Sequence, residues 1–188
     1  MGIKNVSLAD WRFRRVGPVR IKLFMDMQEI LSKVITSTNE IFEAEAGSVA
    51  LIEPSGQELT IRAAVGAGAD AVRGLSLPID KGVMGWVASN EKPALISDVS
   101  ADKRFFADID KESGFHTKSI MCVPLRADGN TIGVIELMNM RSDFLSDNGL
   151  KILSVIADHA ALAIENARLF AQTRQQSDDI IRMVVKFL

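Results

Sequence analysis

The sequence is poor in the residues that build covalent cross-links and metal centres. It holds one cysteine, Cys122, and two histidines, His116 and His159. A single cysteine excludes an internal disulfide framework and any multi-cysteine metal site. Because Cys122 lies within an apolar segment that is predicted to be a strand, we expect a buried and unreactive thiol. The two histidines give little support to a metal centre.

Long apolar runs and an excess of basic charge are also missing. No apolar segment approaches the roughly 20 residues of a transmembrane helix, and no signal peptide is recognisable. The net charge is -2 and the hydrophobic content is 47%. These values describe a globular protein without the concentrated basic face of a nucleic-acid-binding protein. We therefore expect a cytoplasmic protein that has neither nucleic acid nor a membrane as its partner.

A local basic run near the start of the chain is an exception to this balance. Its members are Arg12, Arg14, Arg15, Arg20 and Lys22. Such a run is typical of a solvated tail, and contact with anionic lipid or with a partner is the alternative.

Motifs of common enzyme classes are absent as well. The sequence has no Ser-His-Asp arrangement, no Walker loop and no metal-binding motif. Its 188 residues suffice for one domain with a core of its own and an appendage. We therefore expect a non-enzymatic domain without a cofactor at 20–170. An irregular segment at 1–19 precedes it, and a C-terminal helical coiled-coil linker at 171–188 follows it.

The sequence does contain a series of strands framed by two helices. Apolar spacing predicts a first helix from Arg20 to near Gly47, with one face formed by Phe24, Met27, Leu31, Val34, Thr38 and Ile41. Strands are predicted at 48–53, 59–65, 75–79, 93–97, 119–125 and 131–138, with a short helix at 83–89. The long polar connection at 98–118 indicates a lid. We expect an α+β fold: a central antiparallel β-sheet with the N- and C-terminal helices on one face and a ligand pocket under the lid on the other.

A long terminal helix is predicted from Ser146, which suits the N-cap position. Its apolar stripe comprises Leu150, Leu153, Ala157, Ala160, Ile164, Ala167 and Ala171. The stripe resumes at Ile181, Val185 and Leu188, too far along the helix to reach the sheet of the same domain. We therefore expect a parallel coiled coil in a homodimer, with the Phe24–Ile41 stripe as a second layer. The chain ends in mid-helix, so we also expect a covalently linked output domain beyond Leu188.

Several short motifs occur in a recognisable order. They are Pro78-Ile-Asp-Lys-Gly82, Gly85-Trp-Val-Ala88, Asp98 with Arg104-Phe105, Gly114-Phe-His-Thr-Lys-Ser-Ile-Met-Cys-Val-Pro-Leu125 and Gly133-Val-Ile-Glu-Leu-Met-Asn139. Together they resemble the GAF domain, the small-molecule-sensing module of signalling proteins, over roughly Arg20 to Phe170. The segment Thr117–Cys122 is similar to the subgroup found in cyclic nucleotide phosphodiesterases and some bacterial adenylyl cyclases. The resemblance implies a regulatory sensor that binds a cyclic nucleotide and signals through helical dimer contacts.

The resemblance also implies a set of ligand-binding residues. By position they are Ser48, Val83, Met84, Phe106, Ile109, Asp110, Ser113, Thr117 and Glu136. A cyclic phosphate requires hydroxyls and backbone N–H groups, which Gly82–Met84 would offer at a helix N-terminus. A purine requires an apolar face and a few polar contacts, which Phe106, Ile109 and Ser48 can supply.

Two departures from the pattern of this subgroup bear on the ligand. After the last strand, Asn139 and Phe144 fit its Asn-Lys…Phe…Asp-Glu signature. Met140 replaces the lysine, however, and Asn148-Gly149 replaces the acidic pair. The resemblance assigns a structural role to the Lys–Asp pair of this signature. At the end of the second strand, Ala64-Val65 offers no carboxylate to the N–H groups of guanine, whereas adenine needs none. The pattern therefore favours cAMP over cGMP.

Five of these site residues have an alternative role. Ser113 and Thr117 are also typical loop-capping residues, and Asp110 can be a solvated surface acid. Glu136 can point outward from a strand with one wet face, and Met84 can fill the core. The alternative function is a GAF module that binds no ligand and serves dimerisation. A small, dry pocket filled by methionine would favour that alternative.

Overall fold

The computed structural model describes the backbone of residues 27–186 and the side chains up to residue 176, apart from residues 112 and 175. Some sequence-based expectations lie outside this part of the chain. They concern the segment at 1–19, Arg20 and Phe24 of the first helix, Leu188, and the side chains of Ile181 and Val185.

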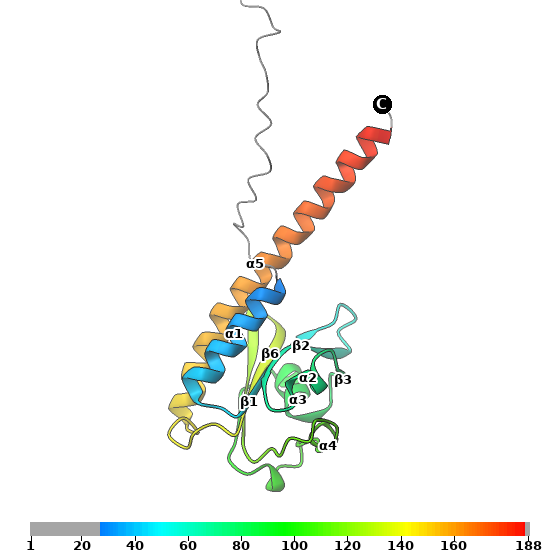
Figure 1. Cartoon of the computed structure of the whole chain (residues 1–188). Helices are drawn as coiled ribbons and strands as arrows, with labels where there is room; N and C mark the ends of the chain where they lie inside the picture. Colours follow the sequence, from blue (N-terminus) through cyan, green and yellow to red (C-terminus); the bar gives the residue numbers. More distant parts are fainter. Residues whose placement is uncertain (1–26, 187–188) are drawn as a thin grey trace, which may run out of the picture.

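The described chain folds as one antiparallel sheet with helices on both faces (Figure 1). The first half comprises α1 (Met27–Phe42), β1 (Ala46–Ile52), β2 (Glu58–Gly66), α2 (Ala69–Val72), β3 (Ser76–Pro78) and α3 (Gly82–Asn90). The second half comprises β4 (Ala94–Ile96), the 3₁₀ turn η2 (Val99–Ala101), α4 (Asp108–Ser113), β5 (Ile120–Ala127), β6 (Asn130–Met138) and α5 (Asp147–Lys186). The strand order β3-β2-β1-β6-β5-β4 confirms the predicted α+β architecture.

The two long helices lie side by side on one face of the sheet (Figure 1). Leu31 and Ile35 of α1 and Leu153 and Ile164 of α5 are buried there, in one core cluster with residues of the sheet. Burial of such a side chain stabilises the fold by about 1.5–3 kcal/mol. The early part of the predicted α5 stripe therefore packs on the sheet of its own domain.

The opposite face of the sheet carries a second core cluster beneath α2, α3 and the connection that includes α4. Val83 and Val87 of α3 pack there with Leu59, Ile61 and Val134 of the sheet. Because the long helices occupy the first face, the second face is the one available for a ligand.

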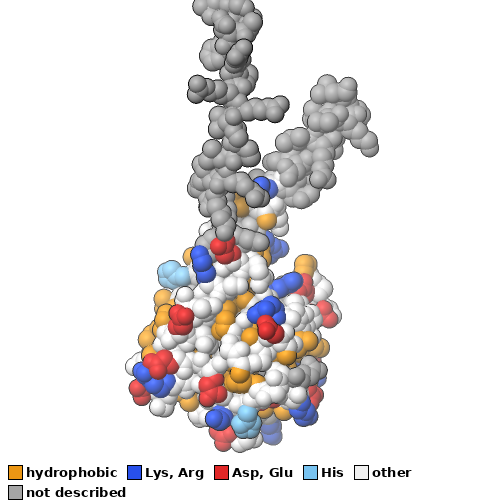
Figure 2. Space-filling model, in the orientation of Figure 1, with side chains coloured by type: hydrophobic (Ala, Val, Ile, Leu, Met, Phe, Trp, Pro, Cys, Tyr) orange, Lys and Arg blue, Asp and Glu red, His pale blue; other side chains and the backbone are white. Residues whose placement is uncertain are grey.

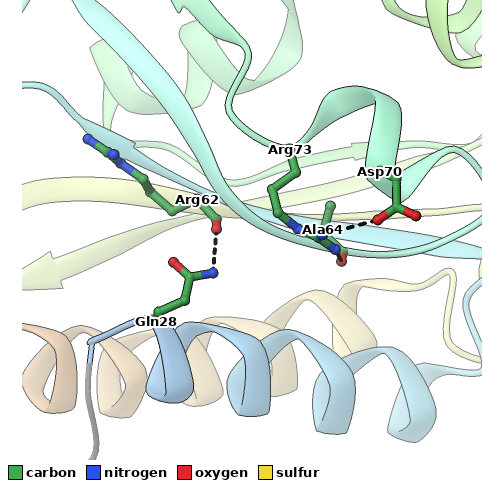
Figure 3. Close-up of polar contacts among 5 residues, drawn as sticks. All are labelled: Gln28, Arg62, Ala64, Asp70 and Arg73. Carbon is green, nitrogen blue, oxygen red and sulfur yellow. Dashed lines mark hydrogen bonds and ion pairs between the residues drawn. The ribbon is translucent and has the colours of Figure 1, made fainter.

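A bulge in β2 decides which of its residues faces α3. Arg62 is the extra residue, because its neighbours on either side pair with consecutive residues of β1. The carbonyl of Arg62 accepts a hydrogen bond from Gln28 Nε2 of α1 at 2.9 Å, and the carbonyl of Ala64 accepts one from Arg73 Nη2 at 3.2 Å (Figure 3). The bulge places Ala63 in the cluster under α1 and Ala64 in the cluster under α3.

The helices differ in part from those predicted. The first helix ends at Phe42 rather than near Gly47, because Glu43 adopts a left-handed backbone with φ of 48°. Two short helices were not among the predicted elements: α2 lies in the connection after β2, and α4 lies in the lid. The N-cap prediction is confirmed, since Ser146 Oγ accepts a hydrogen bond from the Gly149 N–H at 3.2 Å. Among the described helices, none combines the length and apolar character needed to cross a bilayer.

Candidate functional site

A row of cross-strand neighbours forms the floor of the candidate site. Antiparallel register aligns Ala64, Ser48, Glu136, Cys122 and Ala94 on five adjacent strands. Side chains directly opposite one another share a face of the sheet. All five are buried, and four of them are small. The row therefore leaves space above a single buried carboxyl group.

Two small adjoining cavities lie above this row, and we refer to them together as the chamber. Their volumes are about 50 and 40 Å³. Both are lined by Met84, Ile109, Asp110, Glu136 and Met138. A water molecule needs about 10–15 Å³ of such volume, so each cavity has room for a few waters.

The structure brings all nine predicted site residues together around the chamber. Met84, Ile109, Asp110 and Glu136 line both cavities; Val83, Phe106 and Thr117 line the first; Ser48 and Ser113 line the second. The helix α3, the lid and the strands β1 and β6 each contribute residues to the chamber.

Glu136 is the electrostatic centre of the chamber. The pKa of this carboxyl group is raised to about 8, mainly because the group is buried and to a smaller extent because Asp110 carries a negative charge nearby. No hydrogen bond to the carboxyl group of Glu136 is found among the described residues. Near pH 7 this carboxyl group is therefore predominantly protonated, and it can both donate and accept a hydrogen bond toward the chamber. It does not point outward, as the alternative reading of the strand allowed.

Cys122 is buried, as predicted, and the strand register places it opposite Glu136. Burial, followed by the charge of Glu136, raises the pKa of the thiol well above its usual range. A thiol with a raised pKa holds little thiolate, the nucleophilic form. The described residues also contain no group of three His, Cys, Asp or Glu side chains that would hold a metal ion.

The hydroxyl of Ser48 is buried and has no hydrogen-bond partner. Leaving such a group unpaired costs about 1–3 kcal/mol, so unpaired hydroxyls are uncommon in a folded interior. Because Ser48 lines the second cavity next to Glu136, a polar ligand atom in that cavity would supply the missing partner.

The N-terminus of α3 faces the first cavity. Gly82, Val83 and Met84 line this cavity, and no side chain caps the helix at Lys81. The first N–H groups of a helix lack intrahelical partners and attract anions through the helix dipole. Gly82 has φ of 70°, which suits glycine and turns the chain into the helix.

Within the lid, the predicted polar residues bind one another. The carboxylate of Asp110 accepts hydrogen bonds from Thr117 N at 2.8 Å and Thr117 Oγ1 at 2.7 Å. Ser113 Oγ donates to the carbonyl of Ile109 at 2.8 Å and accepts a weak bond from Phe115 N at 3.3 Å. Ser113 therefore has the loop-capping role considered as its alternative, and Asp110 is not merely solvated.

Two anchors that hold the ends of the lid were not predicted from the sequence. At one end, Arg104 forms an ion pair with Asp102 at 2.6 Å and stacks over Trp86 of α3 at 4.3 Å. At the other end, Asn139 Oδ1 accepts hydrogen bonds from Lys118 N at 2.7 Å and Ser119 N at 3.2 Å.

The residues around Asn139 explain how the lid is held without the lysine of the expected signature. Met140, which stands in that position, is buried in the core under α1 and α5. Asn139 instead donates from Nδ2 to the carbonyl of His116 at 2.9 Å and to Glu45 Oε2 at 2.8 Å. A neutral side chain thus connects the lid to the sheet.

Several other residues of the chamber were not predicted from the sequence. Met138 lines both cavities, and strand alternation places it on the same face as Glu136, so this residue was predictable. Phe105 and Phe115 line one cavity each, but they lie in the lid, where no periodic pattern predicts the direction of a side chain.

We predict that Ser48→Ala stabilises the ligand-free protein by about 1 kcal/mol, because it removes an unpaired buried hydroxyl. Urea denaturation measures the change in the free energy of unfolding. Thr60→Val is the matched control: Thr60 is also buried, but its Oγ1 bonds Ser76 Oγ at 2.7 Å, so this variant should lose stability. Equal losses in both variants would contradict an unpaired Ser48.

We predict that Glu136 makes the fold less stable as the pH rises. Its pKa of about 8 in the fold exceeds the ordinary value of 4.5. Below pH 4.5 Glu136 is protonated in both the folded and the unfolded chain, and its contribution to the free energy of unfolding is fully present. Between pH 4.5 and about 8 the group ionises in the unfolded chain only, so this contribution is lost as the pH rises. The slope approaches about 1.4 kcal/mol per pH unit.

Glu136→Gln should remove this slope, which urea denaturation at several pH values would show. Glu58→Gln, at an exposed position at the start of β2, is the control and should keep the wild-type slope. Parallel pH profiles for wild type and Glu136→Gln would contradict the account.

Comparison with known proteins assigns the family. The sequence model of the GAF domain matches residues 26–164. The chain is 30% identical over 165 residues to the dual 3',5'-cyclic-AMP and -GMP phosphodiesterase 11A of Takifugu rubripes. The aligned region covers 82% of this chain and 18% of that protein. The chain is 25% identical over 173 residues to the probable 3',5'-cyclic phosphodiesterase pde-5 of Caenorhabditis elegans, which covers 87% of this chain and 24% of the relative. The chain thus spans less than a quarter of the length of these two relatives.

A solved structure supports the same fold. The GAF domain of a phosphoenolpyruvate-protein phosphotransferase from Coxiella burnetii superposes with a TM-score of 0.69 at 19% identity, covering 78% of this chain and 87% of that one. The matched sequence model, the homology to the phosphodiesterases and the shared fold lead to one conclusion. The chain belongs to the GAF domain family.

Proposed function

We propose that this chain is the regulatory sensor module of a cytoplasmic signalling protein, that it binds a cyclic nucleotide in the chamber, and that it prefers cAMP to cGMP. We propose no catalytic role for the module itself. One observation carries the proposal. The chamber combines the unpaired hydroxyl of Ser48, the protonated carboxyl group of Glu136 and the uncapped N-terminus of α3.

These groups match the parts of a cyclic nucleotide. The anionic phosphate suits the N-terminus of α3, where free N–H groups and the helix dipole favour negative charge. The purine suits the apolar surface of Phe106 and Ile109, with its polar edge toward Ser48 and Glu136. Because Glu136 is protonated near pH 7, it adds no negative charge that would repel the phosphate.

The residue that pairs with Ser48 on β2 supports the proposed preference for cAMP. Ala64 of β2 is its cross-strand neighbour and lines the second cavity, so no carboxylate is available from β2 for the N–H groups of guanine. The Takifugu rubripes relative is a dual phosphodiesterase of cyclic AMP and cyclic GMP. We propose that a covalently linked output domain determines the activity of the whole protein.

A second candidate function is a GAF module that serves dimerisation without a ligand. The chamber is small and is lined by Met84 and Met138, the feature that favours this alternative. Pockets for ligands of drug size measure about 300–1,000 Å³. A cyclic nucleotide therefore requires the lid to move outward, whereas the dimerisation module requires no movement.

Either function would use the exposed side of the long helices. Large apolar side chains there are about half exposed: Ile41, Ile152, Val155, Leu162 and Leu169. Apolar side chains reach the surface over the region of α1 and α5 (Figure 2). A groove between the two helices is lined by Val34, Ile41, Val155 and Ala163 among others. We propose that a second copy of the chain packs on this side, because a patch of this kind favours association.

For the ligand, we predict that isothermal titration gives saturable heat with cAMP and a weaker affinity for cGMP. An N–H donor of guanine that finds no acceptor would make the dissociation constant of cGMP about tenfold larger than that of cAMP. Adenosine, which lacks the phosphate, serves as the control and should bind more weakly than cAMP. Absence of heat and of a thermal shift with either cyclic nucleotide at millimolar concentration would contradict the proposal. That result would favour the second candidate function, a GAF module that serves dimerisation without a ligand.

For the dimer, we predict that the chain sediments as a dimer at micromolar concentration and that Leu162→Glu weakens association at least about tenfold. Leu162 is 54% exposed, so the charge should not disturb the core. Ala101→Glu introduces the same charge at an exposed position of the lid and should leave association unchanged. A wild-type chain that sediments as a monomer would contradict this prediction.

A further inference from the structure

Asp110 stands at the boundary between the chamber and the outside. It lines both cavities of the chamber and also an outer groove of about 730 Å³. Thr117 shares the first cavity and the groove with it. The contact between these two residues thus forms part of the wall that separates the chamber from the groove.

This contact places an anion at Thr117, one of the residues that the resemblance implies for ligand binding. The carboxylate of Asp110 takes both donors of Thr117, the N–H at 2.8 Å and the Oγ1 hydroxyl at 2.7 Å. Hydrogen bonds to an ionised acceptor are roughly twice as strong as neutral ones. A ligand phosphate that used Thr117 would need the same two donors, so it competes with Asp110 for them.

The remainder of the lid restricts where movement can occur. Its ends are held by the Arg104 contact with Trp86 and by the bonds of Asn139 to Lys118 and Ser119. Between these anchors lies α4, a helix of six residues that is too short to be stable alone. Asp110 belongs to α4, whereas Thr117 lies beside the second anchor. The bond between them therefore fastens the middle of the lid to its fixed end.

We propose that Asp110 is a built-in competitor for the anionic ligand: its carboxylate occupies Thr117 and holds α4 over the chamber until a phosphate displaces it. This inference rests on the proposed function. Displacement frees α4 and joins the two cavities to the outer groove, which supplies the volume that a nucleotide needs. Lys111 and Lys118 line the groove and Lys81 lines the first cavity, so cationic groups lie along the path of an incoming anion.

The competition for the donors of Thr117 also determines which class of ligand can open the lid. A neutral nucleoside has no group that replaces a carboxylate at the donors of Thr117, so it leaves the lid closed. A phosphate-bearing ligand exchanges one anion for another and keeps both donors paired. Asp110 therefore selects for an anionic group in addition to a fitting base.

The test uses Asp110→Ala with Asp108→Ala as the matched control. Asp108 is on the same helix and its carboxylate pairs with Lys111 at 2.7 Å, so its removal changes the charge of the lid equally without freeing Thr117. In the ligand-free protein, we expect the Thr117 amide to exchange with solvent about tenfold faster in Asp110→Ala than in Asp108→Ala. In titrations, we expect Asp110→Ala to bind cAMP about threefold to tenfold more tightly than Asp108→Ala.

The outcomes separate this inference from the proposed function. Equal exchange of the Thr117 amide in the two variants, or equal or weaker binding of cAMP by Asp110→Ala, would overturn the role of Asp110. If no variant binds cAMP, the proposed function fails and with it the competition for a nucleotide. The amide exchange then still decides whether Asp110 closes the lid.

Discussion

The register of β6 between β1 and β5 is the constraint on which the site depends. It sets Glu136 opposite Ser48 on one side and Cys122 on the other. Side chains alternate along a strand, so a slip of one residue would send Glu136 into the core under α1 and α5 and bring an aliphatic neighbour to the chamber. The bulge at Arg62 extends the same constraint to β2, because it turns Ala64 toward Ser48. Backbone pairing thus assembles the floor of the site.

The lid supplies the other wall, and its construction explains the small volume of the chamber. Arg104 and Asn139 fix its ends, and the pairing of Asp110 with Thr117 draws α4 onto the sheet. The closed chamber contains one unpaired hydroxyl and one protonated carboxyl group. Both are more costly to bury than apolar groups. A core that served only to dimerise would gain stability from replacing them, which favours the ligand-binding function over the dimerisation module.

Local pattern was enough to predict much of this fold, and the family resemblance supplied the residues of the candidate site. Alternation and turn residues predicted every strand of the sheet, and hydrophobic spacing predicted both long helices. Ser48 and Glu136 were found through the family resemblance, and the pairing of β1 with β6 places them together. By contrast, the bulge at Arg62 depends on Gln28, which is distant in sequence.

The anchors of the lid could not be predicted for the same reason. Arg104 meets Trp86, and Asn139 meets the backbone at Lys118, only once the sheet has formed. Ser113 and Thr117 line the chamber, but the sequence did not show that other lid residues already engage their hydroxyls. Contacts of this kind depend on tertiary geometry, which residue type and spacing do not determine.

The central claim is that the chamber above Glu136 receives a cyclic nucleotide. Backbone amide spectra recorded during titration with cAMP test it residue by residue. The account predicts saturable shifts centred on Ser48, on Val83 and Met84 of α3, and on Thr117. Spectra without shifts at these positions, or with shifts confined to α5, would contradict it.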